Sequence, residues 1–345
     1  MMPVSPQEAA EMLRQAPGPL VIVGGGTQLR PGFAANAELV TTLKLNRMVE
    51  YAPSDQVVCA EAGMTLATLQ AELSRNGQRL AIDPPQPEKA TLGGIIAANS
   101  FGPLRTRYGS VRDLIIGISV VLSDGTPAKG GGKVVKTVAG FDLPKLMCGS
   151  YGTLALITTA TFRVHPVPER SITLLARKAD PVELVKRVRA LQLEPAAMLS
   201  VDRDVHFRFE GFAAGVAAQR EKLRELEEAP WPAPLDAPVR LKVAALPAQL
   251  PQVEKALAPL QARLEWLPMV GIGFAHTQAE AASIAAARRE LLALGGSLVV
   301  EKAPFALAPL DVFGPPPPSL PLQKALKDRL DPRGVLAPGR FTGGT

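Results

Sequence analysis

The sequence predicts an α+β protein in which two regions of different character follow one another. In residues 1–168, short apolar strands alternate with short helices and with long loops rich in glycine and proline. In residues 169–310, strands alternate with amphipathic helices, and no glycine triplet occurs. This difference, together with a length of 345 residues, predicts two domains followed by a C-terminal segment.

The first region begins with an alternation of helix and strand that is typical of a mixed α/β domain. Residues 7–16 are expected to form a helix that ends before Pro17, and the apolar residues 20–23 a strand that leads into three glycines. From residue 83 to residue 110 we expect a long loop without regular structure. The other expected elements are strands 38–42, 57–61, 114–122 and 153–164, helix 65–76, a turn at 123–126 and a short helical segment at 140–149.

The second region contains two sets of elements in a similar order, which predicts paired α+β units built from one layer of strands and one of helices. The first set is strand 171–176, helix 181–192, strands 197–202 and 205–210, and helix 214–228. The second set is strand 239–244, helix 248–259, strands 263–267 and 270–275, helix 279–294 and strand 297–301. Prolines 315–318 predict a rigid connector, and a final helix is expected at 320–330.

Composition and charge exclude several classes of protein. The net charge of +6 raises the question of nucleic-acid binding, but no nucleic-acid-binding motif occurs and only 5% of the residues are aromatic. Cys59 and Cys148 form no CxxC pair, so we expect buried thiols and no iron–sulfur cluster in this chain. The N-terminus lacks a signal-peptide pattern, and the longest apolar run, residues 114–122, is about half a bilayer span. We therefore expect a cytoplasmic protein without direct membrane insertion.

The stretch VIVGGGTQL at residues 21–29 predicts a phosphate-binding loop. A strand followed by three glycines can present consecutive backbone N–H groups, and such a nest holds a pyrophosphate without a lysine. The spacing is not that of a dinucleotide fingerprint, because Leu29 stands where the third glycine belongs. A glycine-rich turn without a ligand remains the alternative for this stretch alone.

Two further stretches are rich in small residues. Residues 91–114 contain Gly93, Gly94, Asn99 and Ser100, which would let the backbone approach a flat ligand. Residues 149–158 place small residues before an alternating strand. A compact loop and an ordinary structural hairpin are the respective alternatives.

The order of these motifs resembles that of the vanillyl-alcohol-oxidase-type FAD proteins. GGGT is followed by TLGG and RYGSVRDLIIG, then by GGKVVKTVAGFDLPKLMCGSYGTLALIT and finally by DPRGVLAPGRF. More narrowly, the sequence is similar to the FAD-binding subunits of bacterial glycolate oxidase, most densely over residues 18–168 and 328–341. The resemblance implies a two-part FAD-binding domain of the PCMH type at residues 1–168, an α/β cap domain at 169–310 and a segment at 311–345 that returns to the first domain.

The resemblance also assigns residues to the cofactor. The pyrophosphate would lie at Gly24, Gly25, Gly26, Thr27 and Gln28, the flavin and adenosine at Pro85, Thr91, Gly93, Gly94, Asn99 and Ser100, and Gly152 and Ile157 would close the site through backbone contacts. Arg340 would sit near the isoalloxazine, although Ala337 replaces the asparagine that usually precedes this Pro-Gly-basic motif. Some relatives tether FAD through a histidine in or just after the glycine loop. None occurs there in this sequence, so FAD is expected to bind non-covalently.

Two departures from the family bear on catalysis. The family's KN-x-AGYDL reads KTVAGFDL at residues 136–143, which loses an amide side chain and a phenol. Catalytic relatives carry a late Gly-Glu-His-Gly segment, whereas this chain reads GGSLVVEKAP at residues 295–304, with Glu301 as the only candidate acid. His165, His206 and His276 have no partner at metal-ligand spacing, so we expect no metal site and leave the catalytic residues unassigned.

These features lead to one interpretation and two alternatives. We expect an FAD-binding subunit of a glycolate-oxidase-like 2-hydroxy-acid dehydrogenase complex that relays electrons or supports assembly. By resemblance, its partners would be a second flavin subunit with the substrate site and an iron–sulfur subunit, and they would be its route to a membrane. One alternative is a self-sufficient dehydrogenase in which Arg105 or Arg340 holds the carboxylate of glycolate or lactate and Glu301 is the base. The other is a non-catalytic scaffold.

Overall fold

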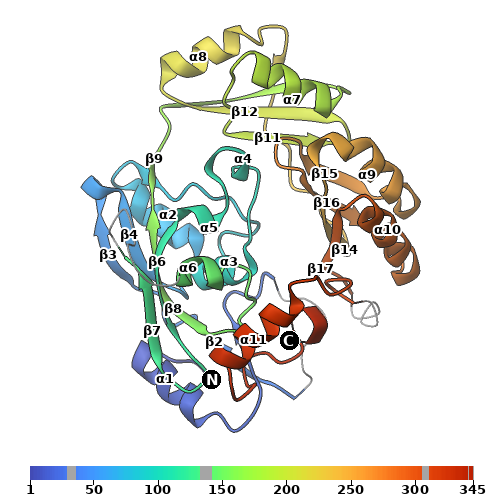
Figure 1. Cartoon of the computed structure of the whole chain (residues 1–345). Coiled ribbons are helices and arrows are strands. Elements are labelled where there is room, and N and C mark those ends of the chain that lie inside the picture. The colour runs from blue at the N-terminus through green and yellow to red at the C-terminus, as the bar shows by residue number, and fades with distance from the viewer. Residues whose placement is uncertain (29–35, 133–141, 305–310, 341, 345) are drawn as a thin grey trace. The chain divides into compact units, whose positions relative to one another are not determined.

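The computed structural model describes residues 1–28, 36–132, 142–304, 311–340 and 342–344, and it divides the chain into two compact units (Figure 1). Unit 1 comprises Met1–Gly102, Gly109–Val167 and Pro315–Thr345, and unit 2 comprises Pro103–Tyr108 and Pro168–Gly314. Both ends of the chain therefore belong to unit 1.

The described residues of unit 1 form three separate sheets. One sheet has five antiparallel strands in the order β3-β4-β8-β6-β7, a second pairs β1 with β2 in parallel, and a third pairs the short strands β5 and β9. The elements of unit 1 are α1 (Pro6–Gln15), β1 (Leu20–Val23), β2 (Glu38–Thr41), β3 (Met48–Ala52), β4 (Val57–Glu61), α2 (Leu66–Ser74), β5 (Gln78–Arg79), α3 (Leu92–Ala98), α5 (Val111–Leu114), β6 (Ile115–Val121), β7 (Pro127–Gly131), α6 (Leu143–Met147), β8 (Leu156–Arg163), β9 (His165–Pro166) and α11 (Leu320–Leu330).

Among the described residues of unit 1, one hydrophobic cluster packs against the five-stranded sheet and another surrounds the β1-β2 pair. The larger cluster packs Leu69 of α2, Ile96 of α3 and Phe162 of β8 against one another, all with side chains that are essentially inaccessible. The smaller cluster joins Leu13 of α1 and Leu20 of β1 to Leu336 of the C-terminal tail. Burying such side chains stabilises each by roughly 1.5–3 kcal/mol, so the tail is an integral part of unit 1.

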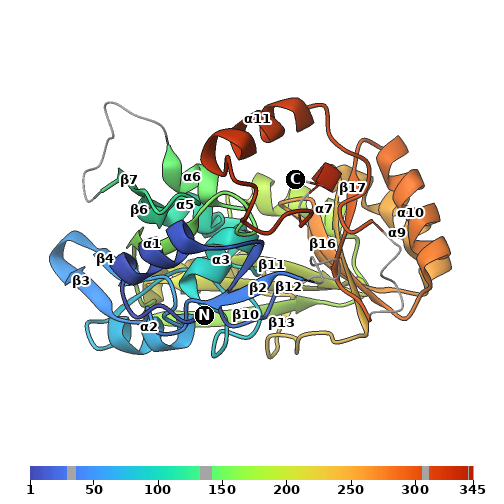
Figure 2. The same ribbon diagram turned by 90° about the horizontal axis from the view of Figure 1, so that it is seen from below.

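Unit 2 is more regular. Its described strands form an eight-stranded antiparallel sheet in the order β13-β10-β12-β11-β15-β16-β14-β17. Helices α9 and α10 lie side by side on it (Figure 2). The elements are α4 (Arg105–Tyr108), β10 (Arg170–Ala176), α7 (Pro181–Ala190), β11 (Ala197–Val201), β12 (Asp204–Gly211), α8 (Ala213–Glu221), β13 (Glu227–Glu228), β14 (Val239–Ala244), α9 (Leu250–Leu257), β15 (Arg263–Leu267), β16 (Ile272–Thr277), α10 (Ala281–Ala293) and β17 (Ser297–Lys302).

The register of this sheet puts α7, α8, α9 and α10 on one face. Phe207 of β12 packs with α7 and α8, and Trp266 of β15 packs with α9 and α10. Pairing of Met198 with Phe207, and of Ser200 with Trp266, places all four side chains on the same face, because alternate residues of a strand point the same way. The predicted paired α+β units are thus confirmed, and they meet where β11 pairs with β15.

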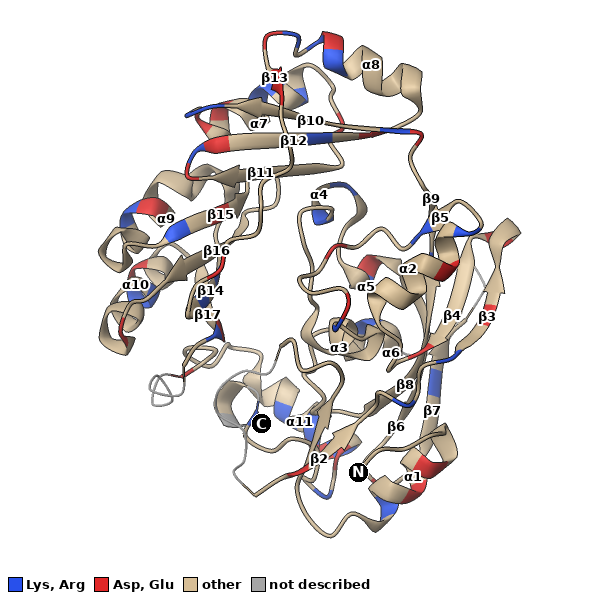
Figure 3. Ribbon diagram, turned by 180° about the vertical axis from the view of Figure 1, so that it is seen from behind, with Lys and Arg blue, Asp and Glu red and all other residues tan. Residues whose placement is uncertain are grey.

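The expected helices and strands of residues 171–301 are largely confirmed, with one error. The helix predicted at 214–228 ends at Glu221, and residues 227–228 form β13 instead. Glu227 and Glu228 pair with β10 and form ion pairs with Arg177 and Arg220. These contacts at the edge of the sheet favour the extended conformation of this segment over a continuation of the helix. Figure 3 shows basic and acidic residues side by side on α7 and at the end of α8, as expected for a solvated surface.

Candidate functional site

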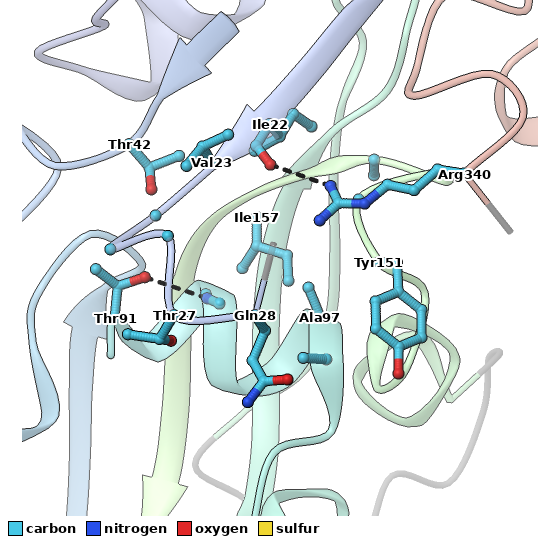
Figure 4. Close-up of a pocket in the computed structure, with 18 residues that line it drawn as sticks. Ile22, Val23, Thr27, Gln28, Thr42, Thr91, Ala97, Tyr151, Ile157 and Arg340 are labelled. Atoms are coloured by element: carbon cyan, nitrogen blue, oxygen red, sulfur yellow. Dashed lines mark hydrogen bonds between the residues drawn. The ribbon is translucent and has the colours of Figure 1, made fainter. Parts of the chain in front are cut away.

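A pocket in unit 1 collects most of the residues that the sequence assigned to a cofactor (Figure 4). Its volume is about 650 Å³ including the space open to solvent, within the usual range for small-molecule sites. Its walls come from the loop after β1, from α3, from the turn before β8 and from the C-terminal tail. The predicted residues that line it are Gly24, Gly25, Gly26, Thr27, Gln28, Thr91, Gly93, Gly94, Gly152, Ile157 and Arg340.

The glycine loop after β1 shows why its residues lack side chains. A Cβ on Gly24 would lie 2.0 Å from Thr91 Oγ1, and one on Gly25 would lie 1.6 Å from the carbonyl oxygen of Lys89. Gly26 has φ +71°, which glycine adopts without strain. The glycines therefore let the loop pack closely against the segment that precedes α3, a reason that the sequence alone did not indicate.

The backbone amides of this loop have the character of an anion cradle. Among the described residues, the N–H groups of residues 24–28 donate no backbone hydrogen bond. Consecutive amides without internal partners, in a pocket and on a loop with a positive φ, are the donors that bind phosphate groups. The donor set therefore fits a pyrophosphate.

Helix α3 corrects the expectation of an unstructured loop over residues 83–110. Thr91 caps it, with Oγ1 accepting the Gly94 N–H at 3.3 Å, and Asn99 ends it in the left-handed region with φ 47°. Its apolar residues, Ile96 among them, face the core of unit 1. Two glycines in the first turn lower the intrinsic helix propensity, but this burial outweighs them. Short helices α4 and α5 also lie in residues 91–114.

The turn before β8 is held by the end of α3. The N–H of Gly149 donates to the carbonyl of Ile96 at 3.0 Å, and the N–H of Tyr151 donates to that of Ala97 at 2.8 Å. Tyr151 and Gly152 both have positive φ, 52° and 75°. This backbone brings Tyr151, Gly152, Ala155 and Ile157 to the wall of the pocket.

The C-terminal tail completes the pocket by pairing with β1. Leu20 donates its N–H to Val335 and accepts the N–H of Ala337, both at 2.7 Å. The pairing carries Arg340 to the pocket, where its guanidinium donates to the carbonyl oxygen of Ile22 at 3.4 Å (Figure 4). The cation therefore lies beside the end of the strand that leads into the glycine loop.

Some predicted residues do not line the pocket, and some lining residues were missed. Pro85, Asn99 and Ser100 are not among the lining residues. The residues missing from the predicted site are Ile22, Val23, Thr42, Ala97, Ala98, Tyr151 and Ala155. The small residues beside predicted ones could have been inferred from the sequence, but Thr42 comes from another strand end and needed the fold. Leu29 and residues 136–141 lie outside the described residues.

The histidines lie away from this pocket's lining. His165 is on β9. His206 and His276 are on the face of the unit 2 sheet opposite α7, α8, α9 and α10, where Nε2 of His276 lies 2.8 Å from Glu265 Oε2. Burial lowers the pKa of His206. Within the described part of the chain, no group of three or more histidine, cysteine or acidic residues is arranged to hold a metal ion.

Glu301 and the two cysteines are the remaining side chains that the sequence raised as chemically reactive, and none of them lines the pocket. Glu301, the candidate base of the self-sufficient alternative, lies 3.4 Å from Arg240 on the neighbouring strand of unit 2. Both cysteines are free thiols, and burial raises the pKa of Cys148 to about 12. A search of the described residues found no helix that is both long and apolar enough to span a membrane.

Comparison with known proteins agrees with the geometry of the pocket. The family model "FAD binding domain" matches residues 1–130. In fold, the chain is similar to alkyldihydroxyacetonephosphate synthase, with a TM-score of 0.73 at 16% identity over 99% of this chain and 77% of that one. The chain thus has an FAD-binding domain, which defines its class as the FAD-binding proteins, and the α+β, PCMH-type fold predicted from the sequence is confirmed.

Full-length relatives narrow this class. The glycolate oxidase subunit GlcE of Escherichia coli (strain K12) is 31% identical over 340 residues, covering 94% of this chain and 92% of the relative. The glycolate oxidase subunit GlcD of Bacillus subtilis (strain 168) is 29% identical over 280 residues, but the match covers only 56% of that protein. The chain belongs to the family of the glycolate oxidase subunit GlcE, as the resemblance predicted.

Proposed function

We propose that this chain is the FAD-binding subunit of a glycolate-oxidase-like 2-hydroxy-acid dehydrogenase complex, in which it relays electrons or supports assembly. The observation that carries the proposal is the match to the glycolate oxidase subunit GlcE along almost the whole of both chains. In this proposal residues 1–168 with the returning segment 311–345 form the FAD-binding domain, and residues 169–310 form the cap.

The pocket of unit 1 would hold the cofactor. The amides of Gly24, Gly25, Gly26, Thr27 and Gln28 would bind its pyrophosphate. Thr91, Gly93, Gly94, Gly152 and Ile157 would line the flavin and adenosine, with Pro85, Asn99 and Ser100 nearby in the chain. Arg340 would sit near the isoalloxazine, where a positive charge stabilises added negative charge. Bound FAD would supply the ability to accept and pass on electrons.

We propose that FAD is held non-covalently. Among the described residues that line the pocket there is no histidine and no cysteine, and the phenol of Tyr151 is the remaining side chain of a kind that could form a covalent bond to the ring. Acid precipitation tests this directly. We expect FAD in the supernatant, and flavin in the pellet would contradict the proposal. The variant Tyr151→Phe would then show whether Tyr151 or another residue carries the link.

The partners follow from what the chain does not supply. Among the described residues no cysteine and histidine side chains gather as ligands of an iron–sulfur cluster, so we propose that electrons would leave through an iron–sulfur subunit. No histidine lines the described pocket, which supports a second flavin subunit as the site where a small 2-hydroxy acid is oxidised. We further propose a cytoplasmic location, with partners providing any attachment to a membrane.

The visible spectrum of the purified chain after gel filtration tests the central claim. We expect flavin absorbance that stays with the protein, and a colourless protein that takes up no added FAD would leave the scaffold alternative. Adding glycolate or lactate under anaerobic conditions then separates the two catalytic interpretations. We expect no bleaching without partner subunits, whereas rapid bleaching by the chain alone would establish the self-sufficient dehydrogenase.

A further inference from the structure

A buried lysine joins the C-terminal segment of unit 1 to the turn beside the pocket. Lys327 lies on α11 and is 8% exposed, and Asp331, just after the helix, is 2% exposed. Neither residue lines the pocket. A buried ammonium is costly unless its hydrogen bonds are satisfied, so its partners show what it does.

The ammonium of Lys327 donates three hydrogen bonds to three separate groups. Its Nζ lies 2.5 Å from Asp331 Oδ2, 2.7 Å from the carbonyl oxygen of Leu336 and 2.8 Å from that of Thr153. A lysine ammonium has three donors, so all of them are used. The cation therefore bridges α11, the tail and the turn before β8.

Asp331 fixes the tail at the same point. Its carboxylate accepts the N–H of Val335 at 3.1 Å and that of Leu336 at 2.8 Å. Val335 and Ala337 are the residues that pair with Leu20 of β1. One ion pair thus holds the tail strand in the register that brings Arg340 beside Ile22.

Two of the three bridged segments, the turn before β8 and the tail, supply walls of the pocket, whereas α11 does not. Thr153 directly follows Gly152, and Leu336 lies four residues before Arg340. The tail also pairs with Leu20, the first residue of the strand that ends at Val23. We propose that Lys327 is a positioning residue for FAD binding: its ammonium sets the distance between the turn that carries Gly152 and the tail that carries Arg340. This inference rests on the proposed function of the pocket.

The same tail contains a natural control. The guanidinium of Arg333 donates to the carbonyl oxygens of Leu13, Arg14, Ala16 and Ser123, at distances between 2.5 and 3.2 Å. None of these acceptors lines the pocket. Like Lys327, Arg333 is a cation whose hydrogen bonds connect the tail to the rest of unit 1. Its acceptors lie in and just after α1 and in the turn after β6.

The experiment compares Lys327→Met with Arg333→Met in the full chain. Methionine keeps the length and apolar stem of lysine but leaves the carbonyls of Thr153 and Leu336 without their donor. FAD affinity is measured by flavin fluorescence on the apo chain, at a temperature where circular dichroism shows each variant folded, and thermal unfolding of the apo chain is recorded separately. We expect both variants to unfold at lower temperature, but the Kd for FAD to rise about tenfold or more only in Lys327→Met.

Two results would overturn the positioning role: a Kd within threefold of wild type in Lys327→Met, or an equal loss of affinity in Arg333→Met. A wild-type chain that binds no FAD would instead overturn the proposed function itself. If Lys327→Met does not fold, hydrogen exchange of the wild-type chain decides the question. FAD is expected to slow exchange at the amides of Val335 and Leu336 and at residues 150–153, and unchanged exchange there would contradict the proposal.

Discussion

Unit 1 and unit 2 differ in how regular their sheets are and in how many stretches of chain build them. Unit 2 is one antiparallel sheet with α7, α8, α9 and α10 on one face, built from two similar sets of elements that follow each other in the chain. The described strands of unit 1 form three sheets, many of its turn residues have positive φ, and the unit is built from three stretches of chain.

The difference corresponds to the location of the proposed FAD site. The regular alternation of unit 2 made its elements predictable, yet it gave no indication of a ligand. Helix α3 of unit 1 was not predicted because its stretch is rich in glycine and lacks a clear period. The same irregular parts of unit 1 contain the glycines and the tail that line the pocket. Backbone approaching a ligand requires bare amides and unusual φ angles, and these are what regular periodicity excludes.

A glycine substitution in each unit gives the largest expected contrast. In Gly25→Ala the new Cβ would collide with the backbone of Lys89, so we expect a loss of about 1–3 kcal/mol in the free energy of unfolding and at least a tenfold weaker affinity for FAD. In Gly215→Ala, on α8, nothing lies within 4 Å of the new Cβ, and we expect a gain of about 0.5–1 kcal/mol. Denaturant unfolding and flavin titration measure both. Equal behaviour of the two variants would remove the contrast.

The cofactor itself should distinguish the units. Both tryptophans, Trp231 and Trp266, lie in unit 2, so their fluorescence reports its unfolding, while flavin release reports unit 1. FAD at about 100 times its Kd adds about 2.7 kcal/mol to the state that binds it. We expect FAD to raise the flavin-detected midpoint more than the tryptophan-detected one, because each unit has its own hydrophobic core. Identical shifts would show that the two units unfold as one.

Charge at the pocket can be separated from charge elsewhere on the tail region. Arg340→Met removes the pocket guanidinium, and hydrogen bonds to charged groups contribute about 1.5–3 kcal/mol, so we expect an FAD Kd about tenfold higher. Arg329→Met, at an exposed position on α11, removes the same charge from the chain and is expected to leave the Kd within twofold. Parallel titrations at two salt concentrations test this. A strong effect of Arg329→Met would indicate a long-range electrostatic field instead of a local contact.

The smallest expected effect concerns pH and unit 2. Burial lowers the pKa of His206, so the folded state takes up its proton less readily than the unfolded state, whose histidine has a pKa of about 6.5. The stability linked to this group is therefore present above about pH 6.5 and is lost as pH falls below it. We expect His206→Gln to flatten the decline of the tryptophan-detected unfolding temperature between about pH 7 and 5. An unchanged slope would assign that decline to other groups.

Most of the fold could be predicted because periodicity reports burial. Strand 239–244 was predicted at its observed bounds because its apolar residues alternate with polar ones, as on a strand with one buried face. Helix 320–330 was predicted at its observed bounds because prolines precede it in the sequence. Strand β3 was missed because both its faces are partly exposed, so it has no clear alternation. The helix expected to reach residue 228 was too long because pairing with β10 is a long-range event.

The candidate site was predicted through its motifs and not through its geometry. The glycine loops and the Pro-Gly-Arg tail are local sequence motifs. The family resemblance that they carry predicted eleven of the residues that line the pocket. Thr42 and Tyr151 were missed because strand order and a positive φ bring them to the pocket. Lys327 belongs to no sequence motif. Its proposed role depends on three acceptors that only the fold brings together.

The pairing of the tail with β1 also makes the pocket depend on contacts between distant parts of the sequence. Ile22 of β1 and Arg340 of the tail lie 318 positions apart, yet both line the pocket. A chain truncated before Val335 would lack the wall that the tail supplies. We therefore expect such a chain to bind FAD more weakly than the full chain, and a flavin titration of both would measure the difference.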